Sequence, residues 1–137
     1  KRRTPVARWR DGPRLLGDCH AVWATLGAKL GPVLFQLPPN FKNDVALLSS
    51  LLRELPTLRA AFEFRHESWL DEKIFALLKS HNIALCLADT EKLAALAVPA
   101  ADYGYLSLRR EDYTVSALAR FAGHVRDKAV QVRETSM

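Results

Sequence analysis

The chain has 137 residues and a net charge of +5, and 49% of its residues are apolar while 26% are charged. This length suits one domain, and this balance is typical of a folded protein rather than a disordered one. No apolar run approaches the roughly 18 residues that a membrane helix needs, and no apolar segment follows the start Lys1-Arg2-Arg3, so we expect a cytoplasmic protein with no membrane partner.

Basic residues gather at the start of the chain. Asp11 alone opposes the group formed by Lys1, Arg2, Arg3, Arg8, Arg10 and Arg14. We interpret residues 1–14 as a solvated, poorly ordered tail. The alternative is a contact with nucleic acid, because basic clusters attract phosphate backbones, although no aromatic platform or RNA-binding signature accompanies this cluster.

Helical and β-prone segments alternate along the rest of the chain. Apolar residues recur at helical spacing over residues 18–30, and Gly31 and Pro32 end this helix. Further helices are expected over 44–55, from Ser68 or Asp71 to about residue 80, over 91–96 and over 115–132. Four strands are expected near 33–37, 60–65, 83–88 and 104–108. This alternation predicts parallel strands, with sequential strands as neighbours.

The strands have two different faces, which can be separated because side chains alternate along a strand. In the second strand Phe62 and Phe64 share one face, while Ala61, Glu63 and Arg65 share the other. Helices covering both faces of an open sheet would bury these charges at a high cost. In a barrel, the apolar face packs against outer helices and the polar face points inward, where a ligand can meet it.

Four segments carry a family resemblance. Residues 30–41 read LGPVLFQLPPNF and residues 62–69 read FEFRHESW, and LCLADT (85–90) and YLSLRR (105–110) follow in order. These four segments resemble those of the YecE-like family, the domain of unknown function numbered 72, over about residues 27–125. The resemblance implies a TIM-type barrel and brings no established reaction.

The chain also departs from that family pattern. A GTSGW-like strand and a TFY segment near the N-terminus are absent, as is a late strand with an FKHE- or FNN-like ending, and Ser107 stands where an arginine is usual. A whole barrel needs roughly 250 residues. We therefore expect an α/β fold that is a partial TIM-type barrel: one incomplete domain with about four parallel strands and outer helices.

Polar side chains follow the predicted strands at their carboxyl ends, the rim where barrels bind ligands. The candidate ligand-binding residues are Gln36, Glu63, Arg65, His66, Asp89 and Arg109. Arginines grip phosphate or carboxylate in a bidentate manner, and the carboxylates and the histidine can act as acids or bases. The structural alternatives are an internal ion pair between Glu63 and an arginine, and helix capping by Asp89.

The two cysteines, Cys19 and Cys86, lie far apart in the sequence and have no CxxC spacing, so we expect neither a disulfide nor a metal site but two reduced, inert thiols. No cofactor can be assigned. The first function hypothesis is a barrel that binds a small anionic or polyhydroxylated ligand, for example one that contains phosphate. The alternatives are a nucleic-acid-binding module and a truncated chain without function. Whether the barrel is an enzyme stays open.

Overall fold

The computed structural model describes residues 9, 11–88 and 100–135. Its elements, in chain order, are α2 (Gly12–Leu26), η1 (Gly27–Lys29), β1 (Val33–Gln36), α3 (Val45–Glu54), β2 (Ala60–Glu63), η2 (Glu67–Trp69), α4 (Glu72–Ser80), β3 (Ala84–Ala88), β4 (Tyr105–Ser107) and α6 (Val115–Thr135). The helix expected over 91–96 lies outside the described residues.

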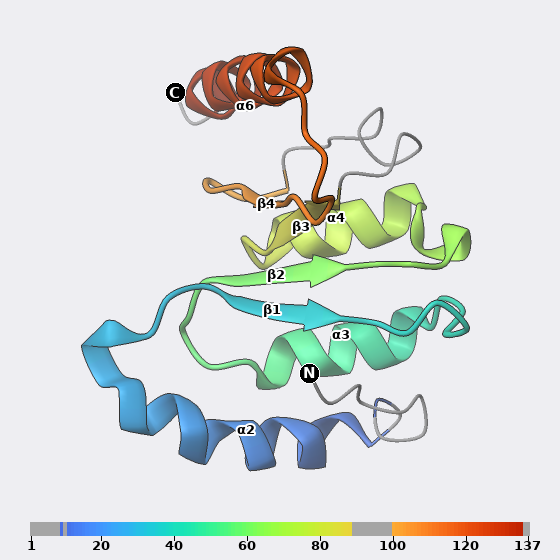
Figure 1. The fold of residues 1–137 in the computed structure, drawn as a ribbon. Helices are drawn as coiled ribbons and strands as arrows, with labels where there is room; N and C mark the ends of the chain where they lie inside the picture. The colour runs from blue at the N-terminus through green and yellow to red at the C-terminus, as the bar shows by residue number, and fades with distance from the viewer. Residues whose placement is uncertain (1–8, 10, 89–99, 136–137) are drawn as a thin grey trace.

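The four strands form one parallel sheet in the order β1-β2-β3-β4 (Figure 1). The register places Gln36 of β1 opposite Glu63 of β2, and Ala61 opposite Ala84 of β3. The sheet curls into a half-barrel with helices around it. The predicted strand order, direction and fold class are therefore confirmed.

Capping side chains fix where two of the outer helices begin. The carboxylate of Asp44 accepts the backbone N–H of Leu47 at 2.9 Å, and α3 starts directly after Asp44. The carboxylate of Asp71 accepts the N–H of Lys73 at 2.7 Å, and α4 starts directly after Asp71. Such caps satisfy N–H groups that have no partner within the helix.

The outer face of the sheet carries the main core. Rings stack along it, with centroid distances of 4.9 Å between Phe35 and Phe62 and 4.8 Å between Phe64 and Trp69. The helices bury their apolar sides on these rings through Leu48, Leu51, Leu52, Ile74 and Leu78. The alternation predicted for β2, with its phenylalanines facing outward, is thus confirmed.

The first helix differs from expectation. It begins at Gly12 rather than near residue 18 and ends at Leu26. Leu15 and Leu16 are buried, and so is Trp9, which packs edge-on against Phe35. Residues 12–14 therefore form the first turn of α2, and the two leucines anchor this end of the helix to the core; residues 1–8 and 10 lie outside the described residues.

The inner face is lined by small residues. Ala61, Ala84 and Cys86 form a buried cluster against which Tyr103 and Tyr105 pack. The Tyr103 hydroxyl accepts the N–H of Ala60 at 2.9 Å, and it lies 2.8 Å and 3.0 Å from the carbonyl oxygens of Ala60 and Asn82, to one of which it donates. This tyrosine ties β2 to the segment before β4 at the amino ends of the strands.

The last helix lies apart from the sheet. Figure 1 shows α6 beyond β4, at the opposite side of the molecule from α2. Several apolar side chains here are exposed: Leu106 and Leu108 in and after β4, and Val115, Leu118 and Val125 on α6. Within the described residues, no helix is both long enough and apolar enough to cross a membrane.

Candidate ligand site at the carboxyl ends of the strands

Three side chains meet on the inner face where the strands end. Gln36 is the last residue of β1, Glu63 is the last residue of β2, and Arg109 follows β4 by two residues. Parallel strands place their carboxyl ends at the same edge of a sheet, so residues far apart in sequence come together. The structure thereby brings together three of the residues expected at the rim.

Glu63 is the centre of this group. Only 3% of its surface is exposed, and it is the single buried charged residue in the part of the chain that the structure describes. The Gln36 amide Nε2 donates to its Oε1 at 3.1 Å, and Arg109 Nη2 donates to its Oε2 at 2.5 Å. Both carboxylate oxygens therefore have a hydrogen-bond donor, which a buried charge requires.

The two arginines contact this carboxylate differently. Arg109 makes the short hydrogen bond, and its Nε also donates to the Ser107 hydroxyl at 2.9 Å. The Nε of Arg65 lies 3.9 Å from Glu63 Oε1, which is an ion-pair distance and too long for a hydrogen bond. Their side chains are 39% exposed for Arg65 and 35% for Arg109, so solvent reaches both.

Ser107 is a contributor that the sequence analysis missed. It was noted only as the place of an absent arginine. Its hydroxyl holds the guanidinium of Arg109, two residues along. The alternation of side chains could have indicated this contact, because residues two apart in an extended segment share a face.

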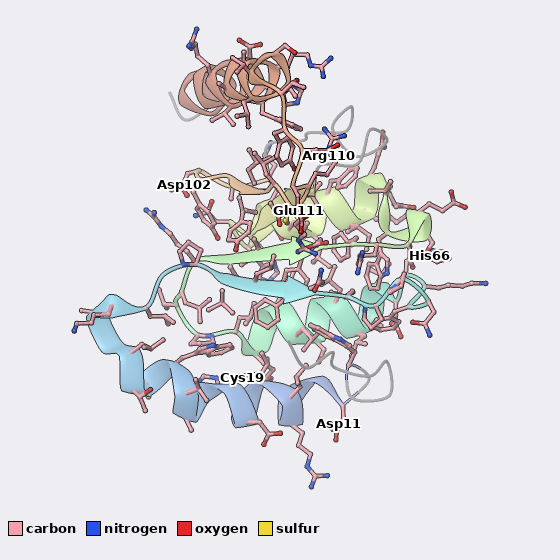
Figure 2. The ribbon with its side chains drawn as sticks, viewed as in Figure 1. Asp11, Cys19, His66, Asp102, Arg110 and Glu111 are labelled. Carbon is pink, nitrogen blue, oxygen red and sulfur yellow. The ribbon has the colours of Figure 1, made fainter. Side chains whose placement is uncertain are left out.

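His66 is part of a different arrangement. It lies beyond the carboxyl end of β2 (Figure 2). Its Nδ1 accepts the N–H of Ser68 at 3.1 Å and lies 2.8 Å from the Ser68 hydroxyl, which also accepts the N–H of Asn43 at 2.8 Å. These contacts cap η2 and join it to the loop before α3. Among the described residues, no hydrogen bond or ion pair joins His66 to Glu63; Asp89, the sixth candidate, lies outside those residues.

Cys86 lies under the charged group on the inner face. Burial, together with the negative charge of Glu63, raises the pKa of its thiol to about 12, although the positive charge of Arg109 acts in the opposite direction. The thiol therefore stays protonated at neutral pH. This agrees with the expectation of an inert thiol at Cys86, and among the described residues no disulfide joins Cys86 to Cys19.

We predict that iodoacetamide at pH 8 alkylates Cys19 at least about tenfold faster than Cys86 in the folded chain, because the thiolate is the reactive form and Cys86 is buried and protonated. Peptide mass spectrometry over time measures both rates. In concentrated urea the two rates should become similar. Equal rates in the folded chain would contradict the buried position of Cys86.

The charges of Glu63 and the two arginines do not balance. One carboxylate faces two guanidinium groups, so these three side chains together carry one net positive charge. Across residues 9, 11–88 and 100–135, no three His, Cys, Asp or Glu side chains gather where they could hold a metal ion. Guanidinium groups that are partly exposed beside a buried carboxylate can receive an oxyanion from solvent.

A parallel half-barrel with polar groups at the carboxyl ends of its strands defines a partial barrel of the TIM type. The family described as "Protein of unknown function DUF72" matches residues 2–136, so the chain belongs to the DUF72 family. This confirms the resemblance to the YecE-like family, and the match extends on both sides of residues 27–125. Among proteins of curated function, none matches this sequence.

Two solved structures share the fold. A DUF72 family protein from Thermotoga maritima has a TM-score of 0.71 and 22% identity, over 88% of this chain and 56% of that protein. A DUF72 family protein from Enterococcus faecalis has a TM-score of 0.57 and 19% identity, over 85% of this chain and 55% of that protein. The chain therefore spans just over half the length of these relatives.

Proposed function

We propose that this chain binds a small anionic ligand, bearing a phosphate or carboxylate group, on the inner face of the half-barrel at the carboxyl ends of the strands. The observation that carries the proposal is the pair of partly exposed guanidinium groups around one buried carboxylate. Ligands of barrel proteins are bound at this end of the strands. The family assigns no reaction, so the proposal is of binding and names no chemical step.

The charge balance favours an anion over a cation. Two guanidinium groups against one carboxylate leave an excess positive charge, and both groups are reached by solvent. A network that served packing alone would need Arg109 to pair with Glu63, but it would not need Arg65 at its longer distance. Arg65 is thus the feature that the purely structural interpretation leaves unexplained.

Titration with inorganic phosphate at constant ionic strength tests the proposal. We expect the unaltered chain to bind phosphate with a dissociation constant on the order of 1 mM or tighter. We expect the double variant Arg65→Gln/Arg109→Gln to bind at least about tenfold more weakly, because it removes both positive charges of the site. Isothermal titration calorimetry measures the affinity, and an amide NMR spectrum checks that the variant is folded.

The matched control is Arg53→Gln/Arg120→Gln, which removes the same charge from two exposed arginines on α3 and α6. Its phosphate affinity should equal that of the unaltered chain. An equal loss of phosphate affinity in both double variants would mean that binding depends only on the net charge of the chain. Tight binding of a DNA oligonucleotide that weakens steeply with salt would instead favour the nucleic-acid alternative.

A further inference from the structure

Within the proposed anion site, we infer that Arg65 binds the anionic group of the ligand and that Arg109 is a positioning residue, which holds Glu63. We infer also that the amide oxygen of Gln36 accepts a hydrogen bond from a hydroxyl group of the ligand. The ligand class is therefore a small molecule with an anionic group and a nearby hydroxyl, such as a phosphorylated polyol or a hydroxy acid. This inference rests on the proposed function and assigns roles to its residues.

Arg109 is held at two of its nitrogens. Nη2 donates to Glu63 Oε2 and Nε donates to the Ser107 hydroxyl. Moving this guanidinium toward a ligand would break a charge-assisted hydrogen bond to a buried carboxylate, which is costly because it leaves that oxygen without its donor. Arg109 thus keeps Glu63 in place and stays where it is when a ligand binds.

Arg65 is held far less firmly. Among the residues that the structure describes, the polar contact of Arg65 is its 3.9 Å ion pair with Glu63 Oε1, and that oxygen already accepts a hydrogen bond from Gln36 at 3.1 Å. Glu63 therefore keeps one donor on each oxygen when Arg65 leaves. Arg65 can therefore exchange Glu63 for a ligand anion at little cost in free energy. In doing so it replaces one long ion-pair contact with two hydrogen bonds to the anion.

Gln36 supplies the second recognition element. The Glu63 carboxylate can only accept hydrogen bonds, so the amide NH₂ of Gln36 must face it and the amide oxygen faces elsewhere. In the part of the chain that the structure describes, no residue donates to that oxygen. Because Gln36 and Arg65 both contact Glu63 Oε1, they lie on the same side of the carboxylate, where one ligand can reach both.

The test compares two probes that differ by their hydroxyls, glycerol 3-phosphate and propyl phosphate, by calorimetry at constant ionic strength. The unaltered chain should bind glycerol 3-phosphate about threefold to tenfold more tightly, the effect of one hydrogen bond. In Gln36→Met, which keeps the length of the side chain and removes its amide, this preference should vanish. Arg65→Gln alone should weaken both probes as much as the Arg65→Gln/Arg109→Gln double variant does.

The outcomes separate the two proposals. If the unaltered chain binds neither probe, the proposed function fails and the inference fails with it. If Arg65→Gln binds both probes like the unaltered chain while the double variant does not, the anion site stands and the role given to Arg65 is wrong. Equal affinity of the unaltered chain for the two probes would overturn the role of Gln36.

Discussion

Replacing Trp69 with alanine should lower the free energy of unfolding by about 3–5 kcal/mol, the usual cost of truncating a large buried aromatic residue. Trp69 is 1% exposed, and its ring lies 4.8 Å from that of Phe64, nearly parallel to it. Its Nε1 donates to the backbone carbonyl of Phe41 at 2.7 Å. The loss is a large fraction of the stability of a typical domain. Urea denaturation followed by circular dichroism measures it.

Two further variants separate the contribution of ring packing from that of the hydrogen bond and provide a comparison with a less buried tryptophan. Trp69→Phe keeps a ring beside Phe64 but leaves the Phe41 carbonyl without its donor, so it should lose less stability than Trp69→Ala. Trp23→Ala removes a half-buried indole of α2 that meets Phe35 edge-on, and it should cost less again. A cost below about 1 kcal/mol for Trp69→Ala would show that η2 does not anchor the outer core.

The sheet could be predicted because each strand is marked by the residues within it and directly beside it. Each strand is a short β-prone run bounded by proline or a turn, and the side-chain alternation in β2 separates Phe62 from Glu63 without knowledge of any partner. The start of α2 could not be found in this way. Leu15 and Leu16 lie among basic residues and glycines, and only their burial against the core shows that the helix begins at Gly12.

The location of the site residues could be predicted from the sequence, but the contacts between their side chains could not. Gln36, Glu63 and Arg109 were expected at the rim because each lies at or just beyond the end of a strand. Which arginine takes the carboxylate is decided by contacts across 46 residues of chain, between Arg109 and Glu63, and nothing in the spacing distinguishes it from the nearer Arg65. His66 follows the same strand, yet the local turn to Ser68 determines its role.

The purified 137-residue chain should self-associate in solution, with species heavier than the 15.4 kDa monomer whose share grows with concentration. In the described sheet, β1 pairs only with β2 and β4 pairs only with β3, so each has one edge without a neighbouring strand. Leu106 and Leu118 add exposed apolar surface on β4 and α6. Open edges and apolar surface both favour association. Size-exclusion chromatography with light scattering measures the mass.

The closed ring of a TIM barrel leaves no strand edge, and the four strands in the described part of this chain make only part of such a ring. Replacing Leu106 of β4 with lysine places a charge on the exposed apolar surface, so this variant should contain a larger share of monomer. The control Ala76→Lys, at an exposed position of α4, should leave the share of monomer unchanged. A monodisperse monomer at about 100 μM with a sharp thermal transition would contradict the prediction. It would mean that the tyrosines packed over Ala61 and Ala84 protect the half-barrel well enough for it to stand alone.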